Sequence, residues 1–209
     1  MNDFRYTGNS ISKSFDQFTK VFSGIDFCIN NSSILGITGP NGSGKSTLLK
    51  IIAGLLSNTK GSLEFNINGK QLAKKDYSNH YSYVAPYLQI YEEFTPAEIM
   101  AIYCKFKNII LNKNRFNHLL DTFKLTKRKN DPIKSFSSGM KQRIKYILAF
   151  QNYNEIIFLD EPFSNLDNEG INSVKRLIEK HYEQGSAIVI AGNDDREISL
   201  CNGILELKK

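Results

Sequence analysis

Apolar and polar positions follow two different periods along this chain. Residues 34–37, 156–159 and 187–191 are short, almost continuous apolar runs, which is typical of strands buried on both faces of a parallel sheet. Residues 63–68 instead alternate apolar and polar between Gly61 and Gly69, which predicts a half-exposed antiparallel strand. A last apolar run at 204–207 predicts a terminal strand. The pattern therefore indicates an α/β fold.

Helical periodicity dominates the middle of the sequence, from about 87 to 135. Thr95, Pro96 and Glu98 form a helix start with cap, first-turn proline and acidic third position. Further helices are expected around 116–123, after Ser137, and from 170 to 184 with Gly185 beyond the end. The expected apolar faces comprise Ile99, Ile102, Tyr103 and Phe106; Phe116, Leu119, Leu120 and Phe123; Met140, Ile144, Ile147 and Leu148; and Ile171, Val174, Leu177 and Ile178.

Composition narrows the class of protein. In 209 residues, 41% are hydrophobic and 23% charged, which fits a globular chain and excludes a disordered or fibrous one. Neither a membrane span nor a signal peptide is expected. Cys28, Cys104 and Cys201 have no ligand-like spacing, so neither a disulfide framework nor a zinc site is expected and a reducing compartment fits. The net charge of +6 indicates a solvated basic surface; a nucleic-acid or anionic-membrane surface is the alternative, which no aromatic-basic pattern supports.

A glycine-rich loop follows the strand at 34–37 and precedes an apolar helix. It matches G-x-x-x-x-G-K-[ST] at Gly39, Gly44, Lys45 and Ser46. Glycines let backbone N–H groups approach phosphate oxygens, and the helix directs its positive end at the same anion. Lys45 is expected at the β- and γ-phosphates, Ser46 on Mg²⁺ and Thr47 at the α-phosphate. The expected phosphate-binding residues are Gly39, Pro40, Asn41, Gly42, Ser43, Gly44, Lys45, Ser46 and Thr47.

Two carboxylates end the strand at 156–159. Asp160 lies at the carboxyl edge of the sheet, where open α/β sheets bind ligands, so we expect it to complete the Mg²⁺ shell, directly or through water. Glu161 is expected to orient the attacking water and accept its proton. A turn that caps a helix is the alternative for Asp-Glu-Pro, and the phosphate loop in the same chain favours the metal site.

With these motifs the chain resembles the nucleotide-binding subunit of an ATP-binding-cassette (ABC) transporter over nearly its whole length. Residues 135–143 resemble the family's signature sequence: Ser137 and Gly139 match it, whereas Phe136, Ser138 and Met140 are variants. The resemblance implies that Ser137 and Gly139 contact ATP bound on a second subunit, in a head-to-tail dimer that holds two ATP molecules. It also implies that Asp167 crosses the dimer interface. Without the resemblance, the segment is only a capped amphipathic helix.

The resemblance also implies the architecture. We expect a P-loop NTPase core with a mostly parallel sheet, a small antiparallel β-lobe and a helical signature lobe, as one ABC ATPase domain over residues 1–209 with the helical lobe at about 87–150. Phe15, 24 residues before Gly39, matches the aromatic that stacks on adenine; a core phenylalanine is the alternative. Exposed Tyr87, Tyr91 and Phe94 are expected to form a groove for a membrane partner, or else to pack the helical lobe.

Two positions depart from the family pattern. Pro86 stands where the family has the glutamine of its Q-loop, and Gln89 lies three residues later. Asn193 stands where the family has its switch histidine. Asparagine can donate a neutral hydrogen bond to a γ-phosphate but carries no proton or charge. We therefore expect ATP binding with slow hydrolysis, carried by Glu161, Lys45 and Asn193.

The resulting functional hypothesis is an ATP-hydrolysing subunit with ATP and Mg²⁺ as cofactors, cytoplasmic and peripheral on the inner face of the membrane. Its expected partners are a separate transmembrane permease subunit and a second nucleotide-binding subunit in a homo- or heterodimer; nucleic acid is not expected. The chain length resembles export-type subunits, including the haem-exporter group. The alternatives are a degenerate regulatory cassette that binds ATP with little hydrolysis, and a soluble ABC ATPase with no role in transport.

Overall fold

The computed structural model describes residues 2–16 and 19–208. By its internal contacts the chain divides into two compact units. The first comprises the chain up to Tyr83, then Asn154–Pro162, and the chain from Lys180 onward. The second comprises Val84–Tyr153 and Phe163–Glu179.

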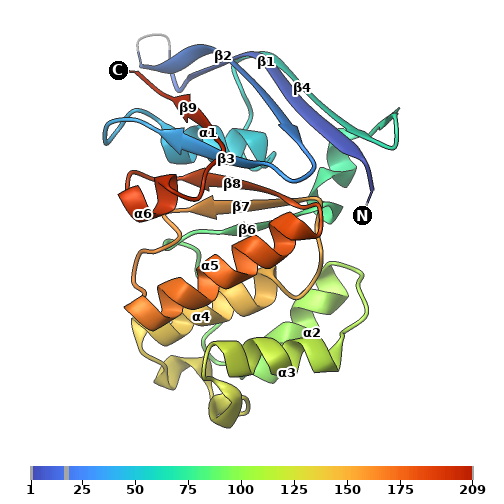
Figure 1. Cartoon of the computed structure of the whole chain (residues 1–209), viewed down its shortest axis with the longest axis vertical. Coiled ribbons are helices and arrows are strands. Elements are labelled where there is room, and N and C mark those ends of the chain that lie inside the picture. The colour runs from blue at the N-terminus through green and yellow to red at the C-terminus, as the bar shows by residue number, and fades with distance from the viewer. Residues whose placement is uncertain (1, 17–18, 209) are drawn as a thin grey trace. The chain divides into compact units, whose positions relative to one another are not determined.

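A five-stranded sheet dominates the first unit. Its order is β6 (Tyr81–Val84), β7 (Ile156–Asp160), β8 (Ala187–Ala191), β3 (Ile34–Thr38) and β9 (Gly203–Glu206). The pairs β7–β8, β8–β3 and β3–β9 are parallel. Every residue of β7 and β8 is buried, which confirms the strands expected from continuous apolar runs. The register places Asp160 and Ile37 on either side of Ala191, so β7 and β3 end at the same edge (Figure 1).

An antiparallel sheet completes the first unit, in the order β2 (Lys20–Asn30), β1 (Phe4–Ser14), β4 (Lys60–Ile67) and β5 (Lys70–Gln71). In β4, Leu63, Phe65 and Ile67 are buried while Glu64 is exposed, as the alternating pattern predicts. The helix α1 (Lys45–Ile52) buries four apolar residues, and the Tyr6 hydroxyl of β1 donates to the Ile52 carbonyl at 2.5 Å. The sheet and α1 thus share one hydrophobic core. The short elements η1 (Lys74–Asn79) and α6 (Asp195–Ile198) complete this unit.

Helices make up most of the second unit. They are α2 (Pro96–Phe106), α3 (Lys113–Thr122), α4 (Ser138–Ala149) and most of α5 (Asn168–Glu183), with the short turns η2 (Thr126–Arg128) and η3 (Ile133–Ser135). The start of α2 has the expected capping box: Thr95 Oγ1 accepts from the Glu98 N–H at 3.2 Å, and Glu98 Oε2 accepts from the Thr95 N–H at 2.8 Å. The expected faces of α3 and α5 are buried. In α4, Ile144 and Ile147 are buried, whereas Met140 and Leu148 are only half-buried.

The expected apolar face of α2 is wrong in part. Ile99 is buried, but Ile102 is 43% exposed and Phe106 is 86% exposed. The buried side instead carries Met100 and Cys104. Because i and i+4 share a helix face, 100 and 104 form one apolar row and 102 and 106 form another, and only the first row packs inward. Among the described residues, none of the helices is both long and apolar enough to cross a membrane.

Candidate active site

The glycine-rich loop spans residues 39–44 between β3 and α1. Gly39 and Gly44 have φ angles of 139° and 97°, a region that side chains rarely enter. A Cβ at Gly39 would lie 2.4 Å from the Leu207 carbonyl oxygen, and one at Gly44 would lie 2.5 Å from Val21 Cγ1. Both positions therefore require glycine on two grounds, backbone angle and close packing.

Lys45 folds back over this loop. Its ammonium donates to the carbonyls of Gly39 at 2.8 Å and Pro40 at 3.2 Å. Within the described part of the chain it forms no ion pair, so its charge has only carbonyl dipoles as partners. Ser43 is 2% exposed and its hydroxyl has no hydrogen-bond partner among the described residues. A buried hydroxyl without a partner in the loop, and an uncompensated ammonium at the start of the helix that follows it, fit a bound polyphosphate.

Ser46 and Asp160 meet at the edge of the sheet. Ser46 Oγ donates to Asp160 Oδ1 at 2.9 Å, and Tyr83 Oη donates to Asp160 Oδ2 at 3.5 Å. Asp160 is 2% exposed and ends β7, whereas Ser46 lies in the first turn of α1. A hydroxyl and a carboxylate are the hard oxygen ligands that Mg²⁺ prefers. The donor set therefore fits the metal expected here.

Glu161 follows Asp160 in a strained turn. Its φ is 43°, which is uncommon for a residue with a side chain and is often found at functional sites. Its N–H donates to the Ala191 carbonyl of β8 at 2.8 Å. This bond fixes the backbone of Glu161 against the sheet and leaves the residue exposed beside a buried Asp160.

Asn193, two residues after β8, contacts the glycine-rich loop. Its Oδ1 accepts from the Gly39 N–H at 3.3 Å, and its Nδ2 donates to Asn41 Oδ1 at 3.4 Å. The sequence placed Asn193 opposite a γ-phosphate only through the family resemblance. The structure gives it a direct contact with the loop, because the parallel register of β3 and β8 brings the ends of both strands together.

Phe15 is 62% exposed, with the Lys13 ammonium 5.0 Å above its ring. This exposure rules out the alternative of a core phenylalanine. Stacking of Phe15 on an adenine stays a prediction.

The signature-like segment forms the start of α4. Ser137 is its N-cap, and the Ser137 side chain accepts from the Met140 N–H at 3.3 Å. A Cβ at Gly139 would lie 3.2 Å from the Asn165 carbonyl oxygen, so this turn packs closely on the segment after β7. Asp167, in that segment, accepts from the Gly170 N–H at 2.8 Å and from Arg143 Nη2 at 2.7 Å. These two donors lower the pKa of Asp167.

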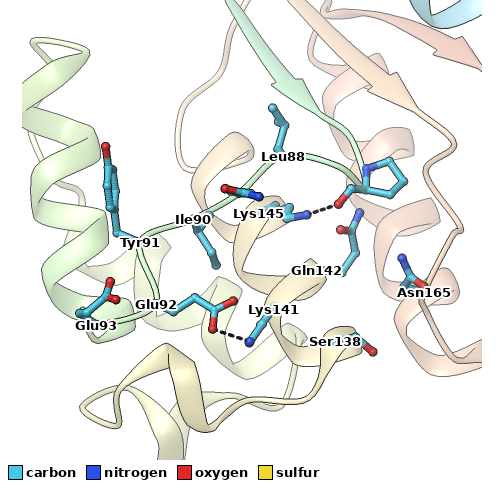
Figure 2. Close-up of a pocket in the computed structure, with 12 residues that line it drawn as sticks. Leu88, Ile90, Tyr91, Glu92, Glu93, Ser138, Lys141, Gln142, Lys145 and Asn165 are labelled. Carbon is cyan, nitrogen blue, oxygen red and sulfur yellow. Dashed lines mark hydrogen bonds and ion pairs between the residues drawn. The ribbon is translucent and has the colours of Figure 1, made fainter.

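A groove of about 530 Å³ lies within the second unit (Figure 2). The expected aromatics are exposed in this unit: Tyr87 by 48%, Tyr91 by 71% and Phe94 by 36%. Figure 2 shows Glu92 and Lys141 pointing toward each other. Glu92 Oε2 and Lys141 Nζ form an ion pair at 2.6 Å. Sequence reasoning missed Lys145, whose ammonium donates to the Pro86 carbonyl at 2.6 Å and whose pKa is lowered by burial. The groove lining includes Leu88, Ile90, Tyr91, Lys141, Gln142 and Lys145.

Comparison with known proteins gives this arrangement a family. The sequence pattern of the family described as "ABC transporter" matches residues 22–164. The chain therefore belongs to the ABC transporter family, as an ATP-binding domain of the ATPase class. This confirms the family resemblance and the α/β P-loop architecture expected from the sequence.

Individual relatives agree with this assignment. An uncharacterized ABC transporter ATP-binding protein, YcbN of Bacillus subtilis, is 30% identical over 88% of this chain; the chain spans 60% of that protein's length. The cytochrome c biogenesis ATP-binding export protein CcmA of Nitrosospira multiformis is 28% identical over 86% of this chain and 87% of its own. A solved structure described as the ATP-binding subunit of an ABC transporter shares the fold, with a TM-score of 0.85 at 24% identity over 97% of this chain and 85% of that chain. These names do not favour the alternative of a soluble ATPase outside transport.

Proposed function

We propose that this chain is the ATP-hydrolysing subunit that energises a membrane transporter. The observation that carries the proposal is the 2.9 Å contact between Ser46 Oγ and Asp160 Oδ1, next to a loop whose amides, ammonium and buried hydroxyl suit a triphosphate. Mg²⁺ bound by these two oxygens would neutralise charge on the phosphates. Lys45 binds the β- and γ-phosphates, Thr47 the α-phosphate, and Phe15 stacks on the adenine.

Glu161 and Asn193 complete the site on the γ-phosphate side. Glu161 accepts the proton of the attacking water, and the strained turn holds its backbone in place for this role. Asn193 donates a neutral hydrogen bond from Nδ2, having exchanged its contact with Asn41 for one with the nucleotide. Because asparagine supplies no charge, hydrolysis is slow relative to a cassette with histidine at this position.

The proposed assembly rests on the family resemblance. The two units together form one ABC domain over residues 1–209, and Ser137 and Gly139 contact the ATP of a second cassette in a head-to-tail dimer. A permease subunit docks on the groove, which Tyr91 lines, and on the exposed Tyr87 and Phe94, which lie outside the groove lining. The protein is then peripheral on the cytoplasmic face of the membrane through that partner. Its cargo is chosen by the permease. Since export proteins are among the relatives, we propose export.

Phosphate release from Mg-ATP by the purified chain tests the proposal. Wild-type protein is expected to turn over ATP, and Glu161→Gln to bind ATP with no turnover. Glu64→Gln, an exposed carboxylate of β4, is the matched control and keeps wild-type turnover. Equal inactivity of wild type and Glu161→Gln, with ATP still bound, contradicts the catalytic assignment. If turnover then appears on addition of a second, different cassette, the protein is the regulatory cassette that Asn193 and Pro86 would permit.

A further inference from the structure

The end of α2 and the turn that joins it to α3 (Figure 1) carry three exposed large apolar side chains, Ile102, Phe106 and Ile110. Phe106 ends α2 and is 86% exposed, and Ile110 in the turn is 94% exposed; no other large apolar side chain in the described residues is as exposed as these two. Ile102, 43% exposed, lies one helical turn before Phe106 on the same face. Isolated exposed apolar residues are ordinary, but three within nine positions form a patch.

The turn is held in a fixed shape. The Lys107 and Ile109 N–H groups donate to the carbonyls of Tyr103 and Cys104, each at 2.9 Å, and so continue the end of α2. At the other end of the turn, Asn112 caps α3, and the buried Gln151 donates to the Asn112 carbonyl at 3.0 Å. The apolar tip is therefore presented by an anchored turn.

Basic residues surround this tip, and acidic residues are absent from it. Between Glu98 and Asp121 the sequence contains four lysine and arginine residues and no aspartate or glutamate. Lys105 and Lys113 are exposed, and within the described part of the chain neither forms an ion pair. Their positive charge is thus available to an anionic surface next to Phe106 and Ile110.

We propose that this apolar and basic turn docks into the headgroup region of an anionic lipid bilayer. Phe106 and Ile110 would enter the boundary between headgroups and acyl chains, while Lys105 and Lys113 would contact the anionic headgroups. A protein partner fits less well, because lysine is depleted at protein interfaces. A second copy of the chain also fits less well, because two identical patches facing each other would bring their own lysines together. The proposal does not depend on the nucleotide site.

Sedimentation with lipid vesicles tests the proposal on the full chain. We expect binding to vesicles of phosphatidylcholine mixed with phosphatidylglycerol, and none to phosphatidylcholine alone. The double variant Phe106→Ser, Ile110→Ser is expected to bind the anionic vesicles roughly tenfold more weakly or worse. The double variant Lys105→Gln, Lys113→Gln is expected to lose roughly fivefold per lysine.

Matched controls lie elsewhere on the surface: Leu55→Ser removes a side chain that is 55% exposed, and Lys75→Gln removes an exposed charge. Both should bind anionic vesicles like wild type, and every variant should keep wild-type ATP affinity, which shows that it folds. Failure of wild type to bind anionic vesicles overturns the proposal. Undiminished binding by Phe106→Ser, Ile110→Ser also overturns the proposal, because electrostatic attraction alone would then account for the binding. A change of oligomeric state in that variant, without vesicle binding by wild type, would assign the patch to a second copy instead.

Discussion

The hydroxyl of Ser46 and the carboxylate of Asp160 are hydrogen-bonded at 2.9 Å, although 114 positions separate them in the chain. The contact arises because α1 starts directly after the loop that follows β3, and β7 ends at the same edge of the sheet. The first turn of a helix and the end of a buried strand thus supply two oxygens to one point. This geometry underlies the nucleotide site that we propose.

Replacing Gly39 by alanine should destabilise the protein more than a left-handed backbone angle alone explains. The new Cβ would meet the Leu207 carbonyl oxygen at 2.4 Å, a backbone atom that cannot move independently. Gly24 is a control for a positive φ without a close contact, since its φ is 66° and a Cβ there meets nothing within 4 Å. In urea denaturation we expect Gly24→Ala to lower the free energy of unfolding by about 1–2 kcal/mol. We expect the loss for Gly39→Ala to be larger than that by at least about 1 kcal/mol. Equal losses would show that packing against Leu207 is unimportant.

The glycine-rich loop and the α2 capping box were predicted from sequence because each rests on local rules. Gly39 to Ser46 form a contiguous motif, and Thr95 and Glu98 satisfy each other's backbone within one turn. The exposure of Phe106 could not be predicted in this way. The helix α2 has two apolar rows, and only the tertiary packing of the second unit decides which row is buried.

Apart from the pairing of Ser46 with Asp160, which the two motifs predict, the long-range contacts of the site could not be predicted from the sequence either. Tyr83 reaches Asp160 because β6 is the neighbour of β7 in the sheet, a pairing of strands far apart in the chain. Lys145 donates to the Pro86 carbonyl, although 59 positions separate the two residues in the chain. The helix α6 was missed because its four residues are too few to show a helical period.

Asn193 should influence turnover more than affinity. It contacts the loop at Gly39 and Asn41, and it is the polar side chain expected to face the γ-phosphate. Steady-state kinetics should show Asn193→Ala lowering kcat roughly tenfold or more, because one stabilising donor is lost, with ATP affinity changed only a few-fold. Asn193→His should raise kcat above wild type. A kcat that is the same in all three proteins would remove Asn193 from the site.

Asp167 should stabilise the fold in a pH-dependent way. The Gly170 N–H and then Arg143 lower its pKa below the ordinary value of 3.8. A carboxyl whose pKa is lower in the folded state stabilises the protein above the unfolded value, and this contribution disappears as the pH falls through the folded value. Asp167→Asn keeps an oxygen for the Gly170 N–H but loses the charge. It should therefore lower the free energy of unfolding by about 0.5–1 kcal/mol at pH 7, a small amount because the side chain is exposed.

Urea denaturation from pH 7 down to below pH 3 measures this dependence. The difference between wild type and Asp167→Asn should shrink across the acidic end of that range. Asp121→Asn, at an exposed carboxyl of α3, serves as the control and should change the free energy of unfolding little. A difference for Asp167→Asn that stays constant down to the lowest pH would mean that the charge is not its origin.

The proposed function depends on a metal-bound nucleotide at the glycine-rich loop, with Ser46 and Asp160 as the protein's metal ligands. Titration calorimetry of ATP with Mg²⁺ and with EDTA tests it directly. Wild type and Ser46→Thr, which keeps the hydroxyl, should bind ATP at least tenfold more tightly with Mg²⁺, whereas Ser46→Ala and Asp160→Asn should lose most of that difference while thermal melts show them folded. A wild-type Mg²⁺ dependence in folded Asp160→Asn would contradict the account.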